Sequence, residues 1–377
     1  MTLTEEQTLI TDMARAFAFE RLRPNAEQWD REKALDRDVL EDLSELGFGG
    51  IYTQEQFGGS GLGRLDAVLI FEQLSKGCVS HATFLSIHNM ATWMIDRFAS
   101  DELRQRFVPD LVAGKKIVSY CLTEPGAGSD AAKLKTRAET TQNGYVLNGA
   151  KVFISGAGFS DTYLVMARTS NDGAKGVSAF VVEKDAPGLS FGKNEEKMGW
   201  RAQPTAMVNF DDCEIPKSNL IGKEGEGFKY AMAGLDGGRI NIAACSLGGA
   251  QDALNRALDY AQDRKQFGRA ISEFQAIQFK LADMETELQA ARALLYQAAT
   301  KLDAKTGDAS KFCAMAKRFV TDTGFKVAND ALQIHGGYGY LADYEVERIV
   351  RDLRVHQILE GTNEIMRVIV SRALIGS

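Results

Sequence analysis

No stretch of this 377-residue sequence is apolar over the roughly 18 residues that a membrane-spanning helix needs. The first residues, MTLTEEQTLITDM, are neither an arginine-rich transit peptide nor a secretory signal. An excess of positive charge is also missing, because the formal net charge is −7, and this argues against general nucleic-acid binding. We expect no membrane or nucleic-acid partner, and a location in a bacterial cytoplasm or, for a processed form, in the mitochondrial matrix.

The residues that usually hold metals are few and poorly spaced. The five cysteines are scattered and contain no C-x-x-C pair, which is typical of reduced thiols. His81 and His88 fit one helix face. However, the sequence lacks the H-E-x-x-H motif of a zinc protease and the E-x-x-H motif of a di-iron bundle. We expect no metal site. A G-x-S-x-G elbow and a Walker loop are absent as well.

The chain is too long for one compact core, and roughly its first 115 residues have a helical pattern. Thr4 and Gln7 form a capping box at the first helix, and Asp36 opens a second helix that Gly47 ends. Ser100 caps a later helix that ends near residue 114. The predicted core-facing side of the first helix consists of Leu9, Met13, Ala16 and Phe17.

From Lys116 to about Pro216 the sequence favours strands. Asn143-Gly144 predicts a hairpin, because type I′ turns need positive φ at both central residues. The strands are too closely spaced for crossover helices, so we expect a largely antiparallel, barrel-like sheet.

Helical periodicity returns after Gly227 and predicts four packed helices. They cover residues 228–262, 272–303, 309–333 and 362–374. The fold class is therefore α+β, with a helical domain, a β-domain and a helical bundle. The predicted boundaries are 1–116, 117–226 and 227–377.

Two glycine-containing stretches have both structural and functional interpretations. Gly126-x-Gly128 matches part of a dinucleotide fingerprint, but the βαβ context is missing, so a plain turn is the alternative to a loop that admits a flat ligand. In LDGGRIN, two glycines precede Arg239 within a helical region. They predict either a loop between helices or the close approach of another group.

Three further stretches stand out for their charged residues or their glycines. DRKQFGRAISEFQ, which contains Arg264, fits a solvated basic turn or a phosphate site. QIHGGYGYL fits a helix end followed by a turn. In VHQILEGTNEIM, Glu360 stands in an apolar context. It either begins the last helix, where the dipole favours a carboxylate, or has a raised proton affinity that serves a function.

Taken in order, YCLTEPGAGSD, FIS, RKQFG, QIHGGYGYL and LEGTNEIMR resemble the acyl-CoA dehydrogenase family over nearly the whole chain. This resemblance implies a helical domain, a central β-barrel and a C-terminal four-helix bundle, with FAD between the last two. It also implies a homotetramer built as a dimer of dimers, and an electron-transfer flavoprotein as acceptor. The implied substrate is a short acyl-CoA, isobutyryl-CoA, with straight-chain butyryl-CoA as the alternative.

The resemblance assigns FAD contacts to both halves of the chain. Those implied near the flavin ring are Tyr120, Leu122, Thr123, Gly128, Ser129, Phe153, Ile154 and Ser155; many relatives have tryptophan at 153. Those implied toward the pyrophosphate and adenosine are Arg264, Phe267, Gln275, Thr362 and Glu364, with Gln333, Gly336 and Gly337 from a neighbouring subunit. Those implied for the substrate are Ser129, Asp236, Arg239 and Arg372.

Glu360 is the implied catalytic base. The α-proton of a thioester is weakly acidic, so its removal needs a base of raised pKa within hydrogen-bond reach. Ile358 and Leu359 are expected to desolvate the carboxylate, and Gly361 to leave room for the thioester. One subset of the family has its base just before the arginine of the 236–239 stretch, where this chain has Gly238.

The sequence is also compatible with two other functions. A flavin oxidase on the same scaffold passes electrons to oxygen, but such relatives usually have an extra C-terminal domain, whereas this sequence ends at Ser377. A non-catalytic helical scaffold is the other alternative. Thr123, Ser129, Arg264 and Glu360 argue against it, because fold alone does not determine function.

Overall fold

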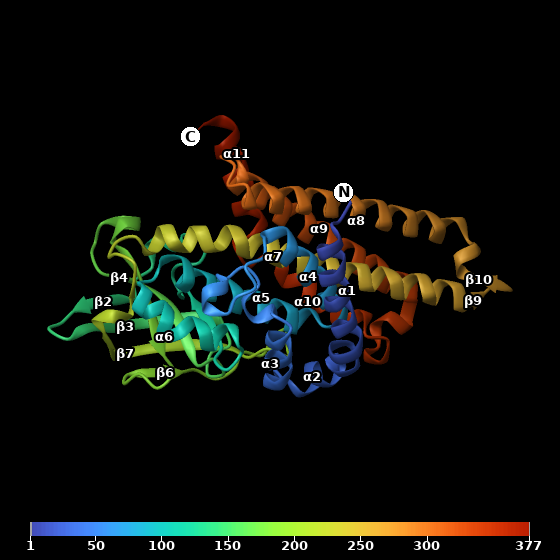
Figure 1. Cartoon of the computed structure of the whole chain (residues 1–377). Coiled ribbons are helices and arrows are strands. Elements are labelled where there is room, and N and C mark those ends of the chain that lie inside the picture. The colour runs from blue at the N-terminus through green and yellow to red at the C-terminus, as the bar shows by residue number, and fades with distance from the viewer. Residues whose placement is uncertain (1, 377) are drawn as a thin grey trace.

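The computed structural model describes residues 2–376 (Figure 1). Within these residues, six α-helices come first, an eight-stranded sheet follows, and five α-helices come last. A short two-stranded sheet, β9 (Lys265–Gln266) and β10 (Arg269–Ala270), lies between the first two of these five helices. The order predicted from the sequence is confirmed, while the boundaries at 116/117 and 226/227 stay predictions. In Figure 1 the sheet lies at one end of the molecule, and the long helices α7, α8 and α9 extend away from it.

The N-terminal helices surround two that are almost fully buried, α4 and α5. Their bounds are α1 (Glu5–Phe17), α2 (Ala26–Glu32), α3 (Arg37–Glu45), α4 (Arg64–Gly77), α5 (Val79–Phe98) and α6 (Asp101–Val112). The predicted caps are confirmed: the Gln7 N–H donates to Thr4 Oγ1 at 3.1 Å, and Asp36 and Ser100 cap α3 and α6. His81 and His88 both lie on α5 and are buried.

The predicted apolar face of α1 is wrong. Leu9 is 65% exposed, and Met13 and Ala16 are exposed as well, while Ala14 and Phe17 are buried. The helix lies at the edge of the molecule and contacts mainly α4, so only a narrow stripe of it is covered. Residues 9, 13 and 16 lie on the neighbouring stripe.

The sheet is open, so the predicted closed barrel is wrong. Its strands are β1 (Val118–Cys121), β2 (Arg137–Thr140), β3 (Gly144–Ser155), β4 (Thr162–Arg168), β5 (Val177–Glu183), β6 (Leu189–Phe191), β7 (Thr205–Pro216) and β8 (Leu220–Ile221). The order is β6-β7-β3-β2-β4-β5-β8, with β1 beside β4. The two terminal strands have three and two residues, and each pairs with one neighbour. The predicted antiparallel pairing holds except at β1–β4 and β2–β4.

The hairpin at Asn143-Gly144 is confirmed, but its turn is not type I′. Strands β2 and β3 pair with Thr140 opposite Tyr145, and neither central residue has positive φ. The Gly144 N–H donates to Thr141 Oγ1 at 3.2 Å. A Cβ at Gly144 would lie 2.0 Å from the Ile215 carbonyl oxygen, so glycine is needed for close strand packing.

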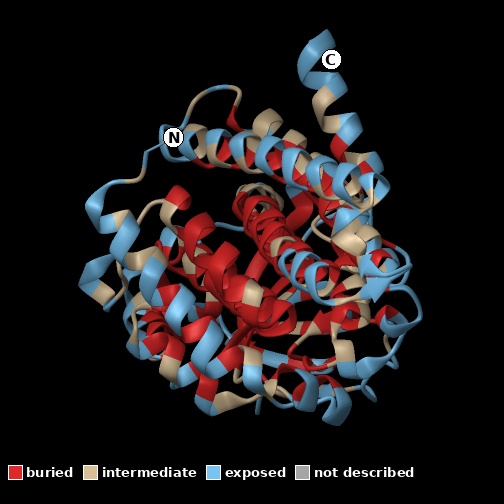
Figure 2. Cartoon of the chain, turned by 90° about the vertical axis from the view of Figure 1, so that its right-hand side faces the viewer, coloured by how far each residue is buried: buried red, intermediate tan, exposed pale blue. Residues whose placement is uncertain are grey.

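The C-terminal helices are α7 (Gly227–Asp263), α8 (Gln275–Asp303), α9 (Ala309–His335), α10 (Val346–Arg354) and α11 (Asn363–Ile375). The four predicted helices are confirmed, and the short α10 was missed. α7 runs unbroken through Gly237 and Gly238, so a loop there is wrong. Figure 2 shows the buried residues gathered inside and the exposed ones on outward helix faces. Within residues 2–376, we find no helix with the length and apolar content to cross a membrane.

Candidate active site

Glu360 lies in the segment between α10 and α11. Thr362 caps α11 by accepting the Ile365 N–H at 3.3 Å, so the helix begins at Asn363. The interpretation of Glu360 as a first-turn residue is therefore wrong. Glu360 has φ +55° and Gly361 has φ +89°. Left-handed backbone is costly for a glutamate, and such residues are enriched at functional sites.

The Glu360 side chain lies against the glycines of α7. A Cβ added at Gly238 would come 2.7 Å from Glu360 Oε2 and 2.8 Å from Met90 Sδ. Oε2 is buried and has no hydrogen-bond partner within residues 2–376. Burial raises the pKa of Glu360 to about 7, against the opposing charges of Arg239 and Lys317. Of the two residues expected to desolvate it, Ile358 is half exposed and Leu359 is partly buried against the core. Met90 of α5 and Gly238 of α7 also lie beside the carboxylate.

Two predicted substrate residues, Asp236 and Arg239, lie on α7 next to its two glycines. Arg239 is buried on α7, pairs with Asp236 through Nη1 and Oδ1 at 2.6 Å, and donates from Nε to the Glu360 carbonyl oxygen at 3.4 Å. Asp236 also accepts a hydrogen bond from Ser310. The close approach predicted at the two glycines is thus confirmed, and the approaching groups belong to the chain itself.

Strand β1 and the segment that follows it contain the predicted site residues that come from the sheet domain. In β1, the Tyr120 hydroxyl is buried without a hydrogen-bond partner among the described residues. Burial first, and the Glu360 charge second, raise the pKa of Tyr120. Leu122 and Ile154 are buried, and the Val152 N–H donates to the Thr123 carbonyl oxygen at 2.9 Å, which joins this segment to β3.

The stretch from Glu124 onward is a turn without the helix of a dinucleotide fingerprint. Glu124 and Ala127 form an isolated bridge, and a Cβ at Gly128 would meet nothing within 4 Å. Ser129 is exposed, and Ser155 is partly exposed at the end of β3. Phe153, in β3, has φ +58° and is 69% exposed, so a large aromatic ring stands in the open beside the turn.

A buried ion pair supports this turn, and sequence reasoning missed it. Lys151 Nζ lies 2.8 Å from Glu124 Oε1 and donates to the Leu122 carbonyl oxygen at 3.0 Å. Glu124 also accepts the N–H groups of Lys135 and Thr136. The available signal was a lysine at an inward position of an alternating strand.

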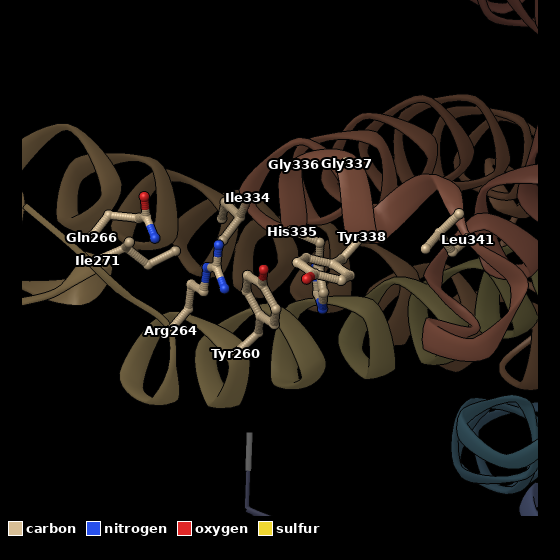
Figure 3. Close-up of a pocket in the computed structure, with 10 residues that line it drawn as sticks. All are labelled: Tyr260, Arg264, Gln266, Ile271, Ile334, His335, Gly336, Gly337, Tyr338 and Leu341. Atoms are coloured by element: carbon tan, nitrogen blue, oxygen red, sulfur yellow. The ribbon is translucent and has the colours of Figure 1, made fainter.

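A second set of predicted residues lies around a cavity of about 420 Å³ at the far end of α7 (Figure 3). Its lining residues are Tyr260, Arg264, Gln266, Ile271, Ile334, His335, Gly336, Gly337, Tyr338 and Leu341. The Arg264 guanidinium lies 5.4 Å from the Tyr338 ring centroid. Gln333 lies in the last turn of α9, and Gln275 begins α8. Phe267 is 94% exposed with φ +51°.

The two sets do not meet within one chain. Gly238 lies on α7 and Arg264 is the residue directly after this helix, 26 positions later, which corresponds to about 39 Å of axial rise. Thr362, Glu364 and Arg372 lie at or on α11, and the last two are exposed. The structure therefore brings Tyr120, Asp236 and Arg239 to Glu360, while Arg264, Gly336 and Gly337 gather elsewhere.

The residues near Glu360 fit a flat cofactor and a carbon acid. Tyr120 and Glu360 each have a buried oxygen without a partner, and polar groups of this kind normally find one. Phe153 and the open position beside Gly128 leave space for a planar ring. The structure describes no cluster of metal-ligating residues in the range 2–376.

The chain belongs to the acyl-CoA dehydrogenase family. The models of its N-terminal, middle and C-terminal domains match residues 4–115, 119–213 and 225–375. The family establishes the predicted enzyme class, a flavin-dependent oxidoreductase, and its cofactor, FAD.

Individual relatives are similar over nearly full length. Mitochondrial isobutyryl-CoA dehydrogenase of Dictyostelium discoideum is 56% identical over 99% of this chain and 90% of its own, and that of Bos taurus is 52% identical over 100% and 90%. Butyryl-CoA dehydrogenase from Megasphaera elsdenii has TM-score 0.96 at 39% identity, covering 100% of this chain and 99% of its own. A chain from a structural study of the electron transferring flavoprotein of Acidaminococcus fermentans has TM-score 0.98 at 45% identity, with full coverage of both.

Proposed function

We propose that this enzyme converts isobutyryl-CoA to methacrylyl-CoA, a step of valine breakdown, with Glu360 as the base. The observation that carries the proposal is the buried, unpartnered Oε2 of Glu360 beside Gly238. Relatives named isobutyryl-CoA dehydrogenase, at 56% and 52% identity, support the choice of substrate.

The chain's own residues perform the proton step. Glu360 Oε2 takes the proton from the carbon next to the thioester carbonyl, and its raised pKa makes it a stronger base than an exposed carboxylate. Gly238 leaves the space in which that carbon reaches the carboxylate. Arg239, fixed by Asp236, holds the Glu360 backbone. FAD, when bound, accepts the hydrogen of the adjacent carbon with its electron pair.

We assign the remaining predicted residues to binding. The flavin ring would be held by Tyr120, Leu122, Thr123, Gly128, Ser129, Phe153, Ile154 and Ser155. The rest of FAD would be held by Arg264, Phe267, Gln275, Gln333, Gly336, Gly337, Thr362 and Glu364. Substrate contacts would come from Ser129, Asp236, Arg239 and Arg372. These roles rest on the resemblance together with the positions described above.

The proposed assembly is a homotetramer made of two dimers. The axial separation of about 39 Å between Gly238 and Arg264 supports a shared site, since a helix of this length separates the two ends rigidly. The sequence assigned only Gln333, Gly336 and Gly337 to the neighbouring subunit. Arg264 lines the same cavity as the two glycines, so we assign it to the neighbour's FAD as well.

Mixing two inactive variants tests the shared site. Arg264→Ala should lose FAD affinity and Glu360→Gln should lose proton abstraction, because each damages a different end of α7. Co-expression should restore measurable dehydrogenation, since hybrid oligomers contain sites that combine an intact Arg264 with an intact Glu360. Light scattering should give four times the mass of one chain. A monomer with full flavin occupancy, or hybrids without activity, would contradict the proposal.

We propose an electron-transfer flavoprotein as the acceptor. The structural study that contains the 45% identical chain describes such a protein. For the compartment, both isobutyryl-CoA dehydrogenase relatives are named as mitochondrial, and another relative, 43% identical, comes from Bacillus subtilis. A matrix or a bacterial cytoplasmic location fits these relatives.

Substrate preference should depend on Leu359, the residue before the base. Family members for straight chains commonly have an aromatic residue there, and leucine leaves lateral room for a methyl branch. We expect kcat/KM to be highest for isobutyryl-CoA, lower for n-butyryl-CoA and 2-methylbutyryl-CoA, and very low for octanoyl-CoA. One methylene in an apolar pocket changes kcat/KM by about 10–200-fold.

A matched variant separates the branch from chain length. Leu359→Tyr should lower kcat/KM for isobutyryl-CoA more than for n-butyryl-CoA, because the ring fills the space beside the α-carbon. If n-butyryl-CoA is the better substrate of the unmodified enzyme, the straight-chain alternative holds. A tenfold preference for isovaleryl-CoA or octanoyl-CoA would refute the short branched assignment and leave the dehydrogenase class intact.

A further inference from the structure

Lys317 is a buried cation beside the proposed base. It lies on α9 and is 0% exposed. Its Nζ donates to the Gly361 carbonyl oxygen at 2.7 Å and to Asn363 Oδ1 at 2.9 Å. Both partners are neutral oxygens, so within the described part of the chain the ammonium group contacts no carboxylate. Buried lysines are rare unless they are paired.

The two partners of Lys317 flank the segment that carries Glu360. Gly361 is the residue directly after it, and both have left-handed backbone. Asn363 begins α11, and its Nδ2 donates to Thr321 Oγ1 at 3.0 Å and to Asp322 Oδ1 at 2.7 Å. One face of α9 thus fixes the backbone on the C-terminal side of the base. An unfavourable conformation persists only where surrounding contacts hold it.

The charge of Lys317 also acts on Glu360. Burial lowers the pKa of Lys317 to about 7, and Glu360 is the leading charge that opposes this shift. Lys317 and Arg239 in turn favour the ionised form of Glu360. Arg239 also acts on Lys317, and it lowers the pKa of that lysine. The other titratable groups coupled to this pair are Tyr52, Tyr120, Asp322, His356 and Glu364.

We propose that Lys317 is a positioning residue for the base. Its ammonium group holds the Gly361 carbonyl and the Asn363 side chain, so that Glu360 keeps its left-handed conformation, and its positive charge favours the carboxylate form of Glu360. This inference rests on the proposed role of Glu360 as the base. Lys317 and Glu360 titrate together, because the loss of a proton from one side chain changes the proton affinity of the other.

The pH dependence of flavin reduction tests this role in the holoenzyme. The rate of reduction by isobutyryl-CoA should rise with pH to a plateau, since Glu360 must be ionised. Lys317→Met removes a positive charge, which makes ionisation harder, so the midpoint should move upward by about one pH unit. The plateau should fall by about tenfold or more, because the base is held less firmly.

Matched variants distinguish this role from a general effect on folding. Lys326→Met changes an exposed lysine of the same helix that pairs with Glu287, and its midpoint should equal that of the unmodified enzyme. Lys317→Gln retains a polar side chain without the charge and should shift the midpoint like Lys317→Met. It provides the test if the methionine variant does not fold. A Lys317 variant that folds and keeps the original midpoint overturns the proposal.

A measurement without turnover separates this inference from the function itself. The infrared carboxyl band that is lost in Glu360→Gln reports the titration of Glu360 directly. Its midpoint should rise in Lys317→Met and stay constant in Lys326→Met. If Glu360→Gln reduces its flavin at the original rate, the base assignment fails while this titration still shows whether Lys317 governs Glu360. An unchanged infrared midpoint would refute the coupling.

Discussion

Glu360→Gln should retain FAD and acyl-CoA binding and lose flavin reduction by several orders of magnitude. The amide has nearly the same shape as the carboxylate but does not accept a proton at neutral pH. Oε2 has no hydrogen-bond partner among the described residues, so few contacts that hold the fold are lost with it. Anaerobic stopped-flow mixing with isobutyryl-CoA, followed at the flavin absorbance, measures the effect.

A control and a binding measurement complete this experiment. Glu45→Gln makes the same chemical change at an exposed residue at the end of α3 and should leave the rate unaltered. Binding of isobutyryl-CoA to Glu360→Gln, followed by the perturbation of the flavin spectrum, should be within a few-fold of the original. A Glu360→Gln enzyme whose flavin is reduced at a near-original rate would rule out Glu360 as the base.

The position of Glu360 could be predicted, but its environment could not. The motif identified the residue, and the reasoning that a base needs a raised pKa agrees with its burial. Of the two expected sources of desolvation, Ile358 is half exposed and Leu359 is partly buried against the core. The actual neighbours, Gly238 and Met90, are 122 and 270 residues distant in sequence. Contacts across such separations depend on helix packing, which local periodicity does not encode.

The elements of the fold were predictable where the pattern was local. The caps of α1, α3 and α6 depend on residues within three positions of each other, and all three are confirmed. Sheet closure depends on whether the first and last strands of the sheet pair. β6 and β8 stand at the two ends of the sheet order and each pairs only with its inner neighbour. The continuity of α7 through Gly237 and Gly238 likewise depends on tertiary packing, which outweighs the low helix propensity of glycine.

The buried lysines show the same limit. Lys151 and Lys317 have no exposed surface, although composition alone predicts lysine at the surface. Each donates to backbone carbonyl oxygens of a segment that carries proposed site residues. Sequence reasoning identified those two segments by their motifs and missed the cations that support them, because the supporting residues come from β3 and α9.

Gly238→Ala should lower flavin reduction strongly while leaving the fold intact. The added Cβ would lie 2.7 Å from Glu360 Oε2 and 2.8 Å from Met90 Sδ, closer than carbon atoms normally approach. The backbone at Gly238 is helical, so alanine itself is favoured there by roughly 0.5–1 kcal/mol. The close contacts of the added Cβ are relieved when the flexible side chains of Glu360 and Met90 move away, and Glu360 is the proposed base.

A displacement of about 1 Å at a catalytic group costs on the order of 10²-fold in rate. We therefore expect the reduction rate of Gly238→Ala to fall by that order, with FAD retained and a melting temperature near the original. Gly249→Ala, on the same helix as Gly238, is the matched control. Its Cβ would lie 2.8 Å from Cγ2 of Val79 on α5, in a contact that does not involve Glu360. It should affect the melting temperature more than the rate. Equal rates in the two variants would show that the space at Gly238 does not position the base.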